Sequence, residues 1–190
     1  EVAKQEQKVE ALLLQKQQEI QKKEAEAAKK SQQAAKASGG NTSTDGADPA
    51  SSNDSYAANT GELRWPLKVS GRISSKFGSR TSPTAGASTY HKGIDISVSS
   101  GTAIVASGAG TVVTATYSST AGNYIMIYHG NSLYTVYMHC SKLGVKVGDT
   151  VNQGDVIGNV GSTGISTGPH LHFGVTVNGS YVNPLNYVSQ

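Results

Sequence analysis

The C-terminal two thirds of this sequence predicts an all-β, mainly antiparallel domain. After residue 61 the chain consists of short runs of Val, Ile, Thr and Tyr, and Gly, Asn and Ser separate these runs instead of amphipathic helices. Short strands at close spacing with turn residues between them are typical of all-β folds. We therefore expect little helix after residue 61, and strands at 104–106, 110–116, 123–128, 134–139, 156–160 and 172–177.

Residues 1–36 have a different composition, rich in Glu, Lys, Gln and Ala and without Gly or Pro. This composition favours an α-helix. A heptad repeat places Leu13 and Ile20 at position a, but it places Lys16 and Lys23 at position d, where a coiled coil needs apolar residues. The segment is therefore either the end of a coiled coil or a solvated single helix. It is a candidate for binding a protein partner, for self-association or for folding back over the β domain.

Residues 37–61 are a predicted flexible linker. Ser, Gly, Asn, Asp, Thr and Ala dominate this stretch, and it offers almost no large side chain to bury. The predicted organisation is a helical segment at 1–36, the linker at 37–61 and a folded domain at 62–190. Because the chain begins Glu-Val-Ala and not with Met, we interpret it as a fragment of a longer protein, whose targeting signal would lie upstream.

The basic residues of the β domain limit the classes of partner. Residues 1–61 carry eight Lys and nine acidic residues, whereas residues 62–190 carry eight Lys or Arg and four acidic residues, so the net charge of +3 comes from the C-terminal part. A mild basic excess suits an anionic polymer such as a cell wall. No Arg-rich or aromatic–basic cluster supports binding to nucleic acid, and no apolar stretch is long enough to span a membrane.

Two histidines two residues apart, His170 and His172, begin an apolar run near the C-terminus. Residues i and i+2 of a strand share a face, so both imidazoles are expected to point the same way. An isolated pair of this kind is more often a polar strand face in contact with solvent. Here the pair gains weight because His91 and His139 occur in contexts that a metal site requires.

His91 and Asp95 lie four residues apart. In a straight strand they would be roughly 13 Å apart, too far to share an ion. Gly93 lies between them and would let the chain bend. With one histidine of the His170/His172 pair they would supply two nitrogens and one carboxylate oxygen, the set that leaves the fourth position of a tetrahedral zinc ion open. The alternative is an Asp that caps a turn and a His in solvent.

His139 is followed by Cys140, the one cysteine of the chain, so no intramolecular disulfide and no Cys-rich zinc site can form. Regular alternation over 134–140 predicts Thr135, Tyr137 and His139 on one face and Cys140 on the other. The thiol is therefore expected to face away from the imidazole and to be a small buried residue instead of half of a Cys–His nucleophile. His129 is expected to be a turn histidine that satisfies backbone groups.

Three ordered motifs resemble a known family. They are His91-x-x-x-Asp95, then Tyr137-Met138-His139, then Gly161-x-x-Gly164-x-Ser166-Thr167-Gly168-Pro169-His170-Leu171-His172-Phe173. Together they resemble the lysostaphin and LytM type of zinc metalloendopeptidase. The resemblance covers about residues 64–188 and includes Phe77-Gly78-x-Arg80 and Asn183-Pro184, with Cys140 where the family commonly has Leu.

This resemblance implies specific roles. His91, Asp95 and His172 would bind Zn²⁺, and His139 and His170 would be the unligated catalytic pair. It also implies a two-sheet antiparallel β fold with a groove over the metal. The implied substrate is a cross-bridge or stem peptide of peptidoglycan, and the implied location is extracellular, at the cell wall.

We therefore expect a secreted zinc endopeptidase that hydrolyses peptidoglycan. The Gly-rich stretches at 79–90, 117–122 and 162–169 are candidate walls of its groove. An alternative is a non-catalytic cell-wall scaffold or hydrolase activator on the same fold. A lipoyl or biotinyl carrier domain is a further alternative, because the run at 144–158 has a similar Gly-Asp spacing, but that run has no Lys at a hairpin tip. We interpret it as two tight turns.

Overall fold

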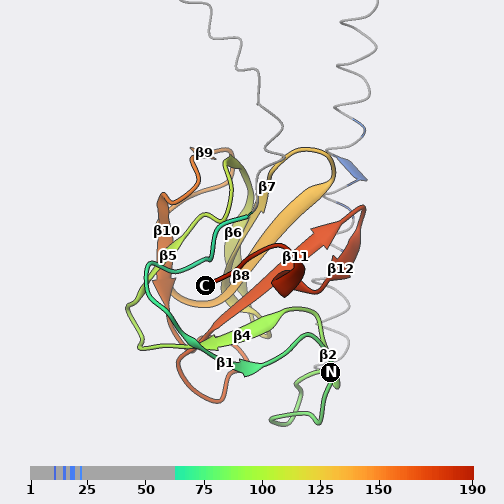
Figure 1. The fold of residues 1–190 in the computed structure, drawn as a ribbon, viewed down its shortest axis with the longest axis vertical. Coiled ribbons are helices and arrows are strands. Elements are labelled where there is room, and N and C mark those ends of the chain that lie inside the picture. The colour runs from blue at the N-terminus through green and yellow to red at the C-terminus, as the bar shows by residue number, and fades with distance from the viewer. Residues whose placement is uncertain (1–10, 12–14, 16–17, 20–21, 23–62) are drawn as a thin grey trace, which may run out of the picture.

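The computed structural model describes residues 63–190 and five residues of the N-terminal segment (Figure 1). These five are helical and exposed: Ala11, Gln15, Gln18, Glu19 and Lys22. The rest of the predicted helical segment at 1–36, including the coiled-coil interpretation, and the predicted linker at 37–61 lie outside the described residues. Within the described part of the chain, no helix is long and apolar enough to cross a membrane.

Residues 63–190 form short strands and a single turn of 3-10 helix, which confirms the all-β prediction. The elements are β1 (Arg72–Ser75), β2 (Gly78–Ser79), β3 (Tyr90–His91), β4 (Ile94–Ser97), β5 (Ala103–Val105), β6 (Gly110–Ser118), β7 (Gly122–Tyr128), β8 (Leu133–Leu143), β9 (Thr150–Val151), β10 (Val156–Val160), β11 (Leu171–Val177), β12 (Ser180–Val182) and η1 (Pro184–Asn186).

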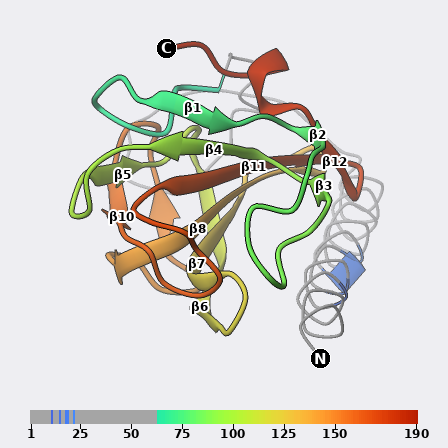
Figure 2. The same ribbon diagram turned by 90° about the horizontal axis from the view of Figure 1, so that it is seen from below.

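Two antiparallel sheets contain all these strands. The larger sheet has ten strands, with the main order β1-β4-β11-β8-β7-β6-β9, and β12, β10 and β5 pair beside this path. Figure 2 shows β1, β4, β11 and β8 side by side. The smaller sheet consists of β2 and β3. The predicted strands correspond to β5, β6, β7, β8, β10 and β11, whereas the short strands β1–β4, β9 and β12 were not predicted.

The main hydrophobic core covers one face of β4 and β11. Ile94 and Ile96 of β4 and Leu171 and Phe173 of β11 are fully buried in this core. Because successive side chains of a strand point to opposite faces, Asp95 and His172, which lie between these residues, point to the other face. Burial of the apolar residues thus aims one carboxylate and one imidazole from neighbouring strands at the same side of the sheet.

The run at 144–158 forms two tight turns, as predicted. Gly148 and Gly154 have left-handed backbones, with φ of 93° and 91°, a conformation that glycine adopts without steric cost. The carboxylates of the next residues, Asp149 and Asp155, accept hydrogen bonds from the backbone N–H groups of residues 146 and 152. The Gly-Asp spacing that resembles a carrier domain is therefore explained by these two turns.

Candidate functional site

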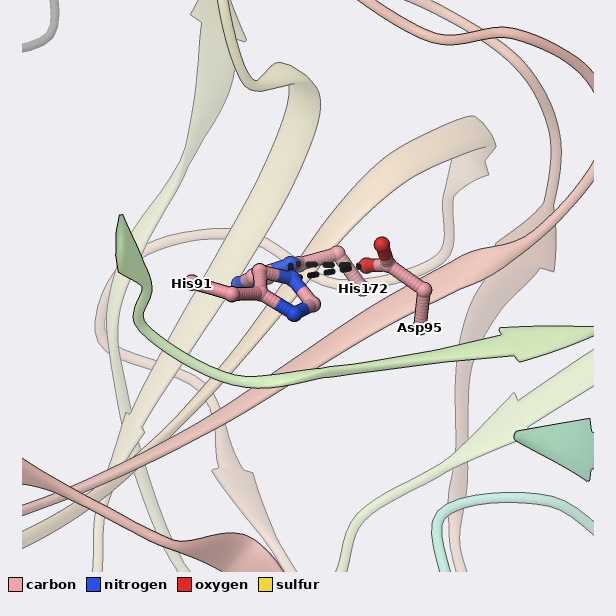
Figure 3. Close-up of side chains that lie close together, drawn as sticks. All are labelled: His91, Asp95 and His172. Carbon is pink, nitrogen blue, oxygen red and sulfur yellow. Dashed lines mark hydrogen bonds and ion pairs between the residues drawn. The ribbon is translucent and has the colours of Figure 1, made fainter. Parts of the chain in front are cut away.

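Three polar side chains, those of His91, Asp95 and His172, converge on one point (Figure 3). His91 Nε2 lies 2.9 Å from His172 Nδ1, and Asp95 Oδ1 lies 3.0 Å from each of these nitrogens. The exposed fractions are 2% for His91 and 8% for both Asp95 and His172. The three atoms form a nearly equilateral triangle that is almost removed from solvent.

This triangle fits a zinc ion. Two imidazole nitrogens and one carboxylate oxygen are a ligand set of catalytic zinc sites, which keep a fourth position open. Bonds of roughly 2.0–2.2 Å to a tetrahedral ion place the ligand atoms roughly 3.3–3.6 Å apart. The observed edges of 2.9 and 3.0 Å are close to that spacing. Small outward movements of the side chains would accommodate the ion.

The three residues come from both sheets. Asp95 on β4 and His172 on β11 are directly paired across neighbouring strands, which brings their side chains together. His91 comes from β3 of the smaller sheet. Gly93 allows these elements to approach, because a Cβ atom there would lie 2.5 Å from Phe173 O and 2.8 Å from His172 Nε2. Residues 92–93 form a bend between β3 and β4, as expected. Gly93 has no left-handed φ, so glycine is needed there for close packing.

The second nitrogen of His91 defines the orientation of its ring. Nδ1 lies 2.9 Å from the backbone oxygen of Lys76 and 3.2 Å from Ser75 Oγ. A carbonyl oxygen can only accept, so Nδ1–H donates to it and the lone pair of Nε2 faces Asp95 and His172. A hydrogen bond of this kind fixes the tautomer of metal-binding histidines.

Burial and hydrogen bonding give Asp95 and His172 the protonation states that a metal requires. Burial raises the pKa of Asp95, but hydrogen bonds with His172 and His91 outweigh burial and hold this pKa well below its usual range. Burial lowers the pKa of His172, and Asp95 only partly offsets this. At neutral pH Asp95 is therefore an anion and His172 is neutral, the forms that coordinate cations.

His139 and His170 face each other beside this triangle, with ring centroids 4.7 Å apart. Each Nδ1 donates to a backbone carbonyl at 2.8 Å, that of Thr163 for His139 and that of Gly168 for His170. The Nε2 atoms remain as acceptors, and that of His170 lies 3.7 Å from Asp95 Oδ1. Burial, with His172 and His170 nearby, lowers the pKa of His139 to about 4. His139 is therefore a neutral imidazole at neutral pH.

The backbone of His139 departs from the predicted alternation. It has a left-handed φ of 64° within β8. Asn123 and Ile125 of β7 pair with Cys140 and Tyr137 of β8, so one extra residue of β8 forms a bulge between these pairs. Tyr137 and Cys140 both pack in the main core, whereas His139 lines the cleft. The prediction that Tyr137 and His139 share a face is wrong, because the bulge turns the imidazole to the opposite side.

Two other sequence predictions are confirmed away from the cleft. Cys140 is fully buried, and burial raises the pKa of its thiol to about 12. His129 contacts the backbone oxygen of Ala109 at 2.8 Å and Thr135 Oγ1 at 2.7 Å. Cys140 is therefore a small core residue, and His129 is a buried histidine with a structural role.

A cleft of about 380 Å³ opens over Asp95, His139, His170 and His172. Residues of two of the predicted walls, 79–90 and 162–169, line it, whereas none of 117–122 does among the residues that the structure describes. Arg72 and Arg80 also line the cleft. Neither arginine was assigned a role from the sequence, although Arg80 belongs to the Phe77-Gly78-x-Arg80 motif.

Comparison with known proteins identifies a matching family and several relatives. The model of Peptidase family M23 matches residues 89–184. The peptidoglycan DD-endopeptidase ShyC of Vibrio cholerae is 43% identical over 123 residues, which cover 64% of this chain and 28% of ShyC. The chain spans 27% to 33% of the length of the first curated relatives that it matches.

Two solved structures share the fold. A zinc-containing peptidase from Vibrio cholerae superposes with a TM-score of 0.61 at 35% identity, over 65% of this chain and 39% of that one. The catalytic domain of the antimicrobial peptidase lysostaphin from Staphylococcus simulans superposes with a TM-score of 0.57 at 35% identity, over 62% of this chain and 91% of that one. The all-β fold described above is therefore that of these peptidases.

Proposed function

The chain belongs to peptidase family M23, and from this premise we propose that it is a zinc-dependent endopeptidase that hydrolyses peptide bonds of bacterial peptidoglycan. The observation that carries the proposal is the triangle of His91, Asp95 and His172 beside the paired imidazoles of His139 and His170. His91, Asp95 and His172 are the proposed zinc ligands, and His139 and His170 are the proposed catalytic residues.

Zinc, when bound, supplies Lewis-acid polarisation of the scissile carbonyl and acidifies water at the metal to a pKa of roughly 7. The side chains of this protein supply the rest. Asp95, as an anion, offsets part of the charge of the cation. His139 is neutral at neutral pH, and its Nε2 can accept a proton from the attacking water. A protonated imidazole can then return a proton to the leaving amine. General acid–base catalysis of this kind typically raises the reaction rate by a factor of about 10² to 10⁴.

The two catalytic histidines are held for this work by backbone groups. The carbonyls of Thr163 and Gly168 fix the Nδ1 atoms of His139 and His170, so both rings keep an Nε2 acceptor at the cleft. Because His170 Nε2 lies 3.7 Å from Asp95 Oδ1, Asp95 would stabilise the imidazolium that forms when His170 takes a proton. This arrangement suits His139 and His170 for taking up and releasing protons in the cleft beside the three proposed ligands.

Peptidoglycan is the proposed substrate because relatives such as ShyC are peptidoglycan DD-endopeptidases. The mild basic excess of residues 62–190 suits this anionic polymer. The proposed location is accordingly the cell wall, outside the cytoplasm. Residues 62–190 are the proposed peptidase domain, with 1–36 as a helical segment that binds a partner or self-associates and 37–61 as the linker.

Digestion of purified cell walls tests the proposal. The protein is incubated with peptidoglycan of defined cross-link type, either as prepared, after chelation or after zinc is restored, and mass spectrometry identifies the released fragments. We expect new amino and carboxyl termini from one type of peptide bond, their loss with chelator and their recovery with zinc. A zinc-loaded protein that releases nothing from any wall type would contradict the proposal and favour the non-catalytic scaffold.

A further inference from the structure

Arg80 connects the smaller sheet to the proposed metal site. It directly follows β2, and its backbone N–H donates to the oxygen of Thr89 at 2.8 Å. Its guanidinium reaches across to the larger sheet, where Nη1 lies 3.0 Å from Asp95 Oδ2. The side chain is 20% exposed. The contact with Asp95 is therefore largely shielded from water, where a hydrogen-bonded ion pair is stronger than at the surface.

This contact divides the two oxygens of Asp95 between different partners. Oδ1 points at His91 and His172, whereas Oδ2 accepts the hydrogen bond from Arg80. A free carboxylate can bind a cation through both oxygens. With Oδ2 engaged by a guanidinium, Oδ1 alone is available, which limits Asp95 to one bond and leaves room for water and substrate at a four-coordinate ion.

Ser75 extends the same contact to a second proposed ligand. Arg80 Nη1 donates to Ser75 Oγ at 2.7 Å, and Ser75 Oγ lies 3.2 Å from His91 Nδ1. His91 is on the smaller sheet and Asp95 on the larger one. One guanidinium therefore binds Asp95 directly and reaches His91 through Ser75, beside the Lys76 carbonyl that accepts from Nδ1. It also links the two sheets that carry these ligands.

We propose that Arg80, supported by Ser75, is a positioning residue that sets the zinc affinity and the coordination number of the site by restricting Asp95 to Oδ1. This inference rests on the zinc site of the proposed function. Partners that orient metal ligands are typically worth a factor of about 10 to 100 in metal affinity. Lysine is only a partial substitute, because its ammonium ends one bond short of Nη1, the nitrogen that makes both contacts.

Zinc affinity tests the proposal directly. The dissociation constant is measured by competition with a chromophoric chelator for the wild type, Arg80→Ala, Arg80→Lys and Ser75→Ala. We expect affinity to fall about 10- to 100-fold in Arg80→Ala and by smaller factors in the other two. Arg72→Ala is the matched control, because Arg72 lines the same cleft without a hydrogen bond or ion pair to a proposed ligand among the described residues, and its zinc affinity should equal that of the wild type.

Cobalt substitution provides a readout that a purely structural role would not change. Four-coordinate Co²⁺ absorbs visible light more strongly than five- or six-coordinate Co²⁺, so Arg80→Ala should show a weaker band than the wild type once Asp95 binds through both oxygens. Arg80→Ala with wild-type affinity, an unchanged cobalt band, or an equal loss of affinity in Arg72→Ala would overturn the proposal. If Arg80→Ala does not fold, Arg80→Lys decides in the same way.

The same titration separates this inference from the proposed function. A wild-type protein that binds no zinc would refute the proposed zinc site. A wild-type protein that binds zinc, with Arg80→Ala binding it equally well, would refute the role of Arg80 alone.

Discussion

At the residue scale, the five polar side chains of the site form two groups, three proposed metal ligands and two proposed catalytic histidines. His91, Asp95 and His172 direct one atom each at a common point. His139 and His170 lie next to each other beside that point, with their rings tilted and their Nδ1 atoms bound to backbone carbonyls. Coordination and proton transfer would therefore be performed by different residues, and single substitutions can separate them.

Alanine substitution should divide the five residues accordingly. His91→Ala, Asp95→Ala or His172→Ala removes one of three ligand atoms, so we expect loss of stoichiometric zinc and of activity. His139→Ala or His170→Ala should retain zinc and lose activity by a factor of about 10² to 10⁴. Metal content by mass spectrometry and turnover on a cross-linked muropeptide measure both properties. Stoichiometric zinc in all three ligand variants would refute the ligand assignment.

The depressed pKa of His139 predicts how stability depends on pH in the metal-free protein. The folded-state pKa is about 4, whereas an unfolded histidine titrates near about 6.5. Below pH 6.5 the unfolded state binds a proton that the folded state does not, so stability falls as pH decreases towards 4, by about 3 kcal/mol in all. Denaturant unfolding after chelation, at intervals from pH 7.5 to pH 4, measures this loss.

His139→Asn is the control for that measurement. Asn tolerates a left-handed backbone and does not titrate in this range. The free energy of unfolding of this variant should decrease with falling pH by about 3 kcal/mol less than that of the wild type. If the free energy of unfolding changed with pH in the same way in both proteins, the protonation of His139 would not contribute to the pH dependence of stability.

At the element scale, the site depends on how closely three strands approach. β4 and β11 place Asp95 opposite His172, and β3 of the smaller sheet brings His91 to them. Only a residue without a side chain fits at position 93, because a Cβ atom would meet Phe173 O and His172 Nε2. The spacing between the sheets is therefore part of the geometry of the site.

Gly93→Ala should disturb both stability and metal binding. The added methyl group must displace the backbone of β11 or the ring of His172, and such overpacking typically costs about 1–3 kcal/mol. We expect this loss in denaturant unfolding, together with weaker zinc binding. Gly168→Ala is the control for stability, since a Cβ atom at position 168 has no neighbour within 4 Å. Equal stability of the two variants would contradict the close approach at Gly93.

At the scale of the whole molecule, the site and both hydrophobic clusters are built from residues 63–190. These residues include every proposed ligand and both catalytic histidines. The peptidase domain should therefore fold and bind zinc without the segment that precedes it. Any role of residues 1–36 would then be exerted through a partner or through access to the cleft.

Removal of residues 1–61 tests this division. The shortened chain should unfold at the same temperature as the full chain and gain the same stability from zinc, about 2.7 kcal/mol at a free concentration 100 times the dissociation constant. Thermal unfolding with and without chelator measures both. Failure to fold would show that the domain begins before residue 62. Unchanged activity and unchanged partner binding would refute a regulatory role for residues 1–36.

The fold class and the five proposed ligands and catalytic histidines could be predicted from local patterns and motifs, whereas Arg72 and Arg80 of the cleft were assigned no role. Strand alternation is a local property, so it was enough to predict that His170 and His172 point the same way. The roles of His91, Asp95 and His139 came from the resemblance of three motifs to a known family. The tight turns at 144–158 and the buried Cys140 followed from equally local chemistry.

The way in which these residues meet depends on contacts between distant parts of the chain. His91 and His172 are 81 positions apart, and their contact depends on pairing between distant strands. The bulge that turns His139 into the cleft arises from the pairing of β8 with β7. The need for Gly93 and the reach of Arg80 to Asp95 depend on the approach of two sheets. Local patterns contain no information about such distances, because long-range pairing and packing set them.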